Sequence, residues 1–159
     1  MVPPLSERAM ADVARAVAYI ALGSNLGDRA AALAEARRGI DALPDTALLA
    51  ESTVEETEPI GPVPQPAYLN QMVAISTALQ PHALLVALLG IERAAGRTRD
   101  VRWGPRTLDC DIVRYMVRYV DVAVQDERLT LPHPELPNRD FWRRELAELE
   151  AMSLTSSDR

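Results

Sequence analysis

Two aspartates two positions apart carry the clearest chemical signal in this sequence, Asp109 and Asp111. Alternate side chains of a β-strand share one face, so both carboxylates should project together while Leu108, Cys110 and Ile112 enter the core. Adjacent carboxylates repel each other, and a hard divalent cation such as Mg²⁺ relieves that repulsion. A lone pair of this kind is also common at solvent-facing strand edges, so its neighbours decide the interpretation.

Those neighbours are arginines. All 17 basic residues of the chain are arginine, and five of them fall within fourteen positions beside the aspartates: Arg93, Arg97, Arg99, Arg102 and Arg106. Guanidinium groups bind phosphate oxygens in a bidentate manner, and a metal ion bridges the same oxygens. The missing lysine excludes a Walker-type phosphate loop, which needs that residue. The pattern therefore predicts a polyphosphate site held by arginines and metal.

Three further residues have side chains suited to binding a heterocycle or a nucleotide. Trp103 offers a flat face, although a tryptophan is as often part of the core. Asn70 follows a proline-rich stretch over 58–67, and its amide matches the donor and acceptor edge of a planar ring. His133 stands between two prolines, which favours a loop over a buried element.

Composition limits the class of protein. The formal net charge of -6 argues against a nucleic-acid partner, which usually meets a basic surface. No apolar stretch approaches the roughly 20 residues that cross a bilayer, so we expect no membrane contact and a cytoplasmic location. The single Cys110 cannot form an internal disulfide and reads as a small buried side chain. We expect one domain over 16–151, with a flexible extension at 1–15 and a flexible tail at 152–159.

Hydrophobic spacing and helix signals predict the elements that hold these residues. Strands are expected at 17–22, 48–57, 69–79 and 107–115, with a further pairing segment at 119–124, and helices at 29–43, 81–95 and 139–151. The loop 97–105 separates the second helix from the aspartate strand. The order predicts an α+β fold of ferredoxin-like type, β-α-β-β-α-β, with helices packed on an antiparallel sheet and appended C-terminal elements.

Four blocks of the sequence together resemble the 6-hydroxymethyl-7,8-dihydropterin pyrophosphokinase family. They are Tyr19-Ile-Ala-Leu-Gly-Ser-Asn-Leu-Gly-Asp28, Glu56-Thr-Glu-Pro-Ile-Gly61 with Gln65-Pro-Ala-Tyr-Leu-Asn70, Ile91-Glu-Arg-Ala-Ala-Gly-Arg-Thr-Arg99 running into Arg102-Trp-Gly-Pro-Arg-Thr-Leu-Asp-Cys-Asp111, and Leu131-Pro-His-Pro134. The resemblance covers about residues 17–141 in the same order. It implies a ferredoxin-like enzyme of folate biosynthesis that moves pyrophosphate from ATP to the pterin's hydroxymethyl group and releases AMP.

The resemblance also implies a role for each matching residue. Asp109 and Asp111 would hold two Mg²⁺ ions that bridge ATP, and Arg97 and Arg106 would stabilise the transferring group. The nucleotide site would comprise Glu92, Arg99, Trp103, Arg106, Arg128, Thr130, His133 and Arg139. The pterin site would comprise Thr57, Glu58, Ile60, Tyr68, Asn70, Trp103 and Phe141, with Asn70 reading the ring edge and Tyr68 and Phe141 stacking on it. ATP and the reduced pterin would be the small-molecule partners of a monomeric transferase.

The sequence departs from the family pattern in three places. Leu89 replaces a frequent glutamine, 116–124 carries extra residues, and Trp142 to Glu150 replaces an apolar segment.

Two other functions fit the sequence less well. A pure ligand-binding protein on the same fold would not need the full set of aspartates and arginines. An RNA-binding domain would need a basic face and strand aromatics, but the chain has one phenylalanine and a negative charge.

Overall fold

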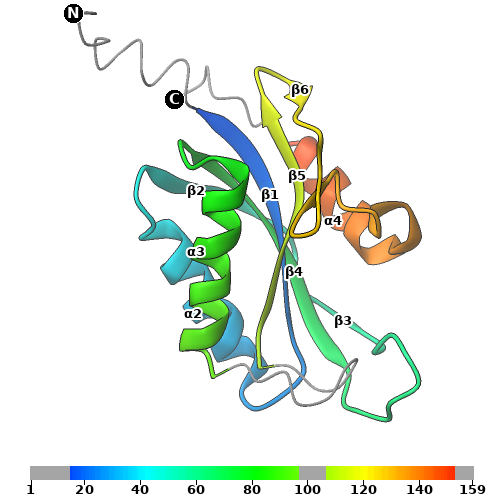
Figure 1. The fold of residues 1–159 in the computed structure, drawn as a ribbon. Helices are drawn as coiled ribbons and strands as arrows, with labels where there is room; N and C mark the ends of the chain where they lie inside the picture. Colours follow the sequence, from blue (N-terminus) through cyan, green and yellow to red (C-terminus); the bar gives the residue numbers. More distant parts are fainter. Residues whose placement is uncertain (1–14, 97–106, 153–159) are drawn as a thin grey trace, which may run out of the picture.

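The chain folds around a twisted antiparallel sheet that has helices on both faces. A computed structural model describes residues 15–96 and 107–152 (Figure 1). The expected N-terminal extension and C-terminal tail lie almost wholly outside these residues, as does the loop 97–105. The elements in chain order are β1 (Ala16–Ser24), α2 (Arg29–Asp41), β2 (Thr46–Glu51), β3 (Glu55–Thr57), β4 (Tyr68–Thr77), α3 (Pro81–Ala94), β5 (Asp109–Val117), β6 (Val120–Asp121), β7 (Val124–Gln125), β8 (Thr130–Leu131), the 3₁₀ turn η1 (Leu136–Asn138) and α4 (Asp140–Glu150).

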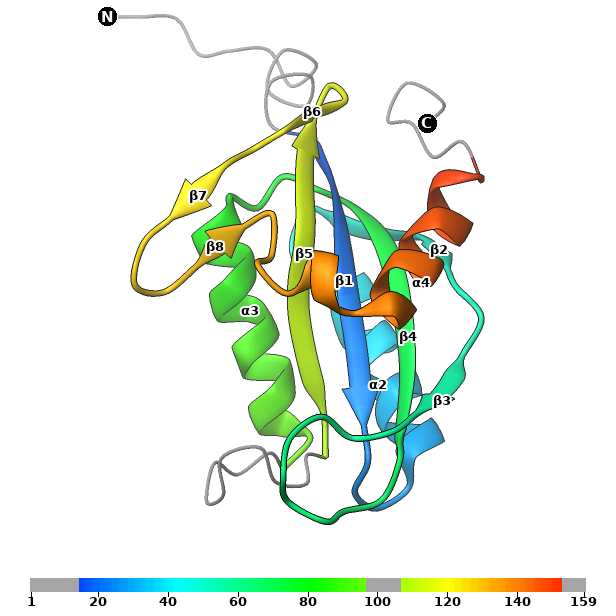
Figure 2. The same cartoon turned by 90° about the vertical axis from the view of Figure 1, so that its right-hand side faces the viewer.

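The sheet places β1 at its centre. Within the described residues the strand order is β2-β4-β1-β5-β6, β3 also pairs with β4, and every pairing is antiparallel. Helices α2 and α3 cover one face, and α4 lies on the opposite face (Figures 1 and 2). This mixed architecture with an antiparallel sheet agrees with the expected α+β class. The C-terminal helix forms a third layer.

The alternation of side chains along β1 divides the core into two parts. Ala18, Ile20 and Leu22 face α2 and α3, while Tyr19 and Ala21 face α4. The first part also contains Leu33, Ile40, Leu84, Leu88, Leu108, Cys110 and Ile112. The second contains Met72, Val113, Trp142, Leu146 and Leu149. Because both faces are buried, the register of β1 is fixed by packing on each side.

Local signals set the limits of the helices close to the predicted positions. Asp28 caps α2, since its carboxylate accepts a hydrogen bond from the Ala31 amide at 3.0 Å. Pro81 begins α3, as its fixed φ angle suits the first helical position. Gly96 follows α3 with a φ of +81°, the left-handed conformation that ends many helices. The first two helices end one or two residues before the expected limits.

The strand expected at 48–57 is wrong as a single element. It consists of β2 and β3, which are separated at residues 52–54. The expected pairing beyond β5 is also more divided than predicted: β6 returns along β5 through a turn at Arg118 and Tyr119, whose φ angles are 51° and 69°, whereas β7 pairs with β8 in a small separate sheet. In the described ranges no helix is long and apolar enough to cross a membrane.

Candidate active site

The two aspartates open β5 and share one side of it. Leu108, Cys110 and Ile112 are at most 5% exposed, so the predicted alternation is confirmed. Both carboxylates line a cavity of about 240 Å³ between the ends of the central strands and the start of α4. This face of the sheet therefore carries the cavity, while the other face packs on α2 and α3.

The same cavity collects the residues expected to bind the pterin. All six of those that the structure describes line it: Thr57, Glu58, Ile60, Tyr68, Asn70 and Phe141. They come from β3, the segment after it, β4 and α4. The seventh, Trp103, lies outside the described residues.

Gly23 of β1 connects the two groups of residues. It is paired with Asn70 on β4 and with Asp109 on β5. Adjacent strands lie about 4.8 Å apart, so the backbones of Asn70 and Asp109 are roughly 10 Å apart across a position that has no side chain. The glycine thus leaves the floor of the cavity open between an amide and a carboxylate.

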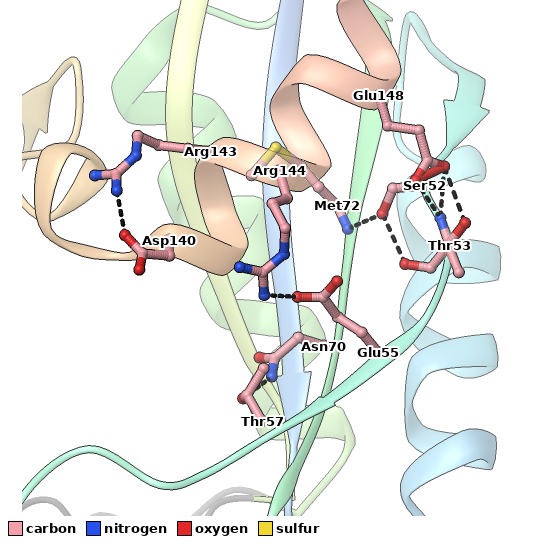
Figure 3. A network of polar contacts seen from close by, with 10 residues as sticks. All are labelled: Ser52, Thr53, Glu55, Thr57, Asn70, Met72, Asp140, Arg143, Arg144 and Glu148. Atoms are coloured by element: carbon pink, nitrogen blue, oxygen red, sulfur yellow. Dashed lines mark hydrogen bonds and ion pairs between the residues drawn. The ribbon is translucent and has the colours of Figure 1, made fainter.

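Asn70 is held by a neighbouring hydroxyl. Its Nδ2 donates a hydrogen bond to Oγ1 of Thr57, which lies on the paired strand β3 (Figure 3). Asn70 is 6% exposed, so its amide is fixed within the wall of the cavity. This arrangement orients the amide of Asn70 before any ligand arrives.

The start of α4 supplies an aromatic wall, of which the sequence predicts only Phe141. Phe141 was expected in the site, but Trp142 also lines the cavity and is 2% exposed. The guanidinium carbon of Arg139 lies 4.3 Å from the centre of the Trp142 ring. Arg139 was expected at the nucleotide, and it lines this first cavity. The position of Trp142 directly after Phe141, close to Asn138 and Arg139, is the feature of the sequence that could have predicted this role.

A second cavity of about 230 Å³ lies on the other side of Asp111. Its lining includes Arg128, Thr130 and His133, three of the residues expected to bind the nucleotide. Asp111 lines both cavities. Asp111 therefore lies between the residues expected to bind the pterin and three of those expected to bind the nucleotide.

His133 is a neutral histidine with a defined tautomer. Its Nδ1 accepts a hydrogen bond from the Glu135 amide at 3.1 Å, so the proton of the neutral ring is on Nε2. Nε2 lies 4.0 Å from Oδ1 of Asp111, and the ring meets Trp142 edge to face at 4.8 Å. Burial, with a contribution from the charge of Arg139, lowers the pKa of His133 to about 4. The ring therefore offers an N–H donor at neutral pH.

Glu92, which is expected to bind the nucleotide, also contacts the strand that carries the aspartates. It is 3% exposed near the end of α3 and is absent from the linings of both cavities. Its Oε2 accepts the backbone N–H of Cys110 at 2.7 Å. This bond joins α3 to the residue between the two aspartates.

The carboxylate pair fits a magnesium site by its chemistry. Asp109 and Asp111 supply hard oxygen ligands, are partly exposed and face the cavity together. In the described parts of the chain no cluster of three or more His, Cys, Asp or Glu side chains surrounds a common point. Phosphate oxygens and water would therefore complete the coordination, as is usual for Mg²⁺.

The predicted arginine site lies outside the described residues. Arg97, Arg99, Arg102 and Arg106 all fall within 97–106, together with Trp103. Their roles stay predictions of the sequence.

Two carboxylates at an amide-and-aromatic cavity, one of which also lines a cavity with Arg128 and His133, suit the metal-assisted transfer of phosphoryl groups. Comparison with known proteins defines the family. Residues 19–151 match the model of the 7,8-dihydro-6-hydroxymethylpterin-pyrophosphokinase family, and the chain belongs to this family. It is thus a pyrophosphokinase, a transferase of diphosphate groups, as the sequence predicted.

Curated relatives agree over most of their lengths. The chain is 46% identical over 132 residues to the 2-amino-4-hydroxy-6-hydroxymethyldihydropteridine pyrophosphokinase of Methylorubrum extorquens, covering 83% of this chain and 81% of the relative. The enzyme of the same name from Haemophilus influenzae is 44% identical over 124 residues, or 78% and 75% of the two chains. That from Bacillus subtilis is 41% identical over 133 residues, or 84% and 77%.

Proposed function

We propose that this chain transfers the diphosphate group of ATP to the hydroxymethyl oxygen of 6-hydroxymethyl-7,8-dihydropterin and releases AMP. The observation that carries the proposal is the pairing of Gly23 with both Asn70 and Asp109. It directs an amide suited to a pterin edge and a carboxylate suited to a metal into one cavity. A substrate bound to Asn70 can then present its hydroxyl group toward the phosphates.

Residues of the first cavity would bind and orient the pterin. Asn70 would read the donor and acceptor edge of the ring, with Thr57 holding the amide in place. Tyr68 and Phe141 would stack on the ring faces, and Glu58 and Ile60 would contact it from the segment after β3. Trp142 joins this set because it lines the same cavity.

Asp109 and Asp111 would hold two Mg²⁺ ions. When bound, magnesium neutralises phosphate charge and aligns the phosphate oxygens. The two carboxylates fix the place of that charge at the border of the cavities. The hydroxymethyl oxygen forms a bond to the β-phosphorus, the bond from that phosphorus to the bridging oxygen breaks and this oxygen leaves with AMP, and the hydroxyl proton passes to water. Positioning by these side chains lowers the barrier, since little covalent chemistry falls to the protein.

Residues of the second cavity would bind ATP. His133 would donate its Nε2 proton to a phosphate oxygen, and Arg128 and Thr130 would contribute a charge and a hydroxyl group. Glu92, Arg99, Trp103, Arg106 and Arg139 complete the proposed nucleotide set. Arg97 and Arg106 would neutralise the charge that develops on the transferring group.

The proposed enzyme is a single domain with a ferredoxin-like fold. The strand order β2-β4-β1-β5, with α2 and α3 on one face, supports a ferredoxin-like arrangement to which α4 is added. Residues 16–151 would form one domain that acts as a monomer in the cytoplasm, in folate biosynthesis.

Isotope labels test which group of ATP is transferred. With the reduced pterin alcohol and Mg²⁺, label from the γ-phosphate of ATP should appear in the pterin product, and label from the α-phosphate should appear only in AMP. A γ-labelled pterin monophosphate together with ADP would contradict diphosphate transfer. Binding of both ligands without any transfer would identify a ligand-binding protein that is not an enzyme.

A further inference from the structure

Helix α4 contacts β3 and the segment between β2 and β3 with side chains from one face. Arg144 donates a hydrogen bond to Oε1 of Glu55 at 2.8 Å. Glu148, one turn later, accepts the Thr53 amide at 2.8 Å and the Thr53 hydroxyl at 3.2 Å (Figure 3). Positions four apart lie above one another on a helix, so both contacts come from the same stripe of α4.

Thr53 lies where the sheet has one residue too many. Glu51 is paired with Val73 and Glu55 with Asn70, so residues 52–54 oppose only residues 71–72 of β4. An extra residue interrupts the ladder and leaves a backbone group unpaired. Glu148 accepts the Thr53 amide at this interruption. The helix therefore stabilises the point at which β2 gives way to β3.

The strand β3 has few other contacts among the described residues, one of which is an ion pair between its Glu56 and Arg29 of α2 at 3.2 Å. It is three residues long and pairs with β4 alone, and so short a strand is marginal without outside contacts. It nevertheless carries Thr57, which orients the amide of Asn70. Glu55 stands directly opposite Asn70. A shift of β3 would therefore move the hydrogen bond that orients Asn70.

Between the two contacts of α4 lies a buried acid. Glu145 is 2% exposed, and neither of its carboxylate oxygens has a hydrogen-bond partner among the described residues. The charged groups that face it are Glu55 from β3 and Arg144 and Glu148 from α4. Burial and the charge of Glu55 raise the pKa of Glu145 to about 8, against the opposing effect of Arg144. The raised pKa favours the protonated form of Glu145 at neutral pH, which lessens its repulsion with Glu55 and Glu148.

We propose that Arg144 and Glu148 form a clamp that holds β3 in register on β4 and so sets the affinity of the first cavity for the pterin ring. These are positioning residues, since they act through Glu55 and Thr53. The same helix carries Phe141 and Trp142, so it connects the aromatic wall of the cavity to the wall formed by Thr57 and Asn70. The ligand assignment rests on the proposed function, whereas the hold on β3 does not.

A set of matched variants tests the clamp. Arg144→Ala and Glu148→Ala each remove one contact with the β2–β3 segment. Arg143→Ala is the control, because Arg143 is a neighbouring exposed arginine that contacts Asp140 (Figure 3) and the Pro137 carbonyl oxygen, both near the start of α4. Titration with the reduced pterin alcohol should show binding weakened about three- to tenfold in the first two variants, the range expected when a partly exposed ion pair no longer keeps β3 in place. The KM for ATP should match the wild type in all three variants. The pterin affinity of Arg143→Ala should also match the wild type.

Hydrogen exchange separates the clamp from the proposed function, because it needs no ligand. Amides of residues 53–57 should exchange faster in Arg144→Ala and Glu148→Ala than in the wild type, and those of β1 should not change. If the wild type binds no pterin, the proposed function fails, and the exchange rates still test the hold on β3. Unchanged exchange, or an equal loss of pterin and ATP binding, would overturn the clamp.

Discussion

Gly23 and Asn70 are directly paired across β1 and β4, and a Cβ atom at Gly23 would lie 3.1 Å from Oδ1 of Asn70. The same atom would lie 3.3 Å from Cδ1 of Tyr68. Few real Cβ atoms have neighbours this close, so even one methyl group would press on both side chains. Position 23 must therefore be glycine because the cavity side chains leave no room for a Cβ atom, and not because of the backbone turn that follows β1.

Gly23→Ala should weaken pterin binding by about tenfold, since it displaces the amide that would read the ring edge, a loss of about 1.4 kcal/mol. Calorimetric titration with the pterin alcohol measures this change. Gly90→Ala is the matched control, because a Cβ atom there meets only Arg93, at 3.9 Å, within a helix. That control should keep full affinity and gain up to about 1 kcal/mol of stability. Equal pterin affinity in both variants would remove Gly23 from the site.

Asp109→Asn and Asp111→Asn should each abolish turnover and leave the unfolding temperature within a few degrees of the wild type. Asparagine keeps the shape but removes the charge that a magnesium ion needs. The dependence of the rate on Mg²⁺ concentration measures the effect. Asp45→Asn is the control, because Asp45 lies in a turn with a φ of 51°, which asparagine tolerates well. A wild-type rate in either of the first two variants would refute the metal assignment.

Glu145 makes stability depend on pH. Its pKa is raised from 4.5 to about 8 in the folded protein, chiefly by burial. Between these two values the unfolded carboxyl loses its proton while the folded one keeps it, so the folded state binds more protons and stability falls as pH rises. The slope from this group is at most about 1.4 kcal/mol per pH unit.

Urea unfolding at pH 5, 6, 7 and 8 measures that slope. Glu145→Gln should flatten it, whereas Glu35→Gln, at an exposed position of α2, should not. An unchanged slope in Glu145→Gln would show that the carboxyl is ionised in the folded protein at neutral pH.

Much of the fold follows from local signals in the sequence. A short apolar run of β-forming residues marked β1, alternation around the two aspartates marked β5, and Asp28, Pro81 and Gly96 marked helix ends. The interruption at residues 52–54 could not be predicted in this way. It depends on the register against β4 and on Glu148, which lies 95 residues from Thr53 in sequence.

The site was predicted in part for a similar reason. Asp109 and Asp111 could be placed together because strand geometry is local, and the pterin residues followed from resemblance to a family. The place of Trp142 depends on α4 packing against the second face of the sheet. Glu92 was assigned to the nucleotide site, but its bond to the Cys110 amide arises from the packing of α3 on β5, which no spacing of residues reveals.

Two arginines that lie outside the described residues are expected to act at different stages. Arg97 follows Gly96, and Arg106 lies three positions before Asp109, the first residue of the aspartate strand. A contact made only in the transition state lowers kcat without raising KM. Arg97→Ala should therefore lose kcat about a hundredfold with ATP affinity nearly intact, while Arg106→Ala should lose both. Titration with a non-hydrolysable ATP analogue decides between them, and equal losses of affinity would assign both arginines to ground-state binding.

The most direct test of the central claim is the nucleotide product. Purified protein is incubated with ATP and Mg²⁺, with and without 6-hydroxymethyl-7,8-dihydropterin, and AMP, ADP and the pterin diphosphate are quantified by chromatography. We predict AMP and pterin diphosphate in a one-to-one ratio, formed only when the pterin alcohol is present and lost in Asp109→Asn. Formation of ADP in place of AMP, or AMP formed at the same rate without the pterin, would contradict the proposed diphosphate transfer.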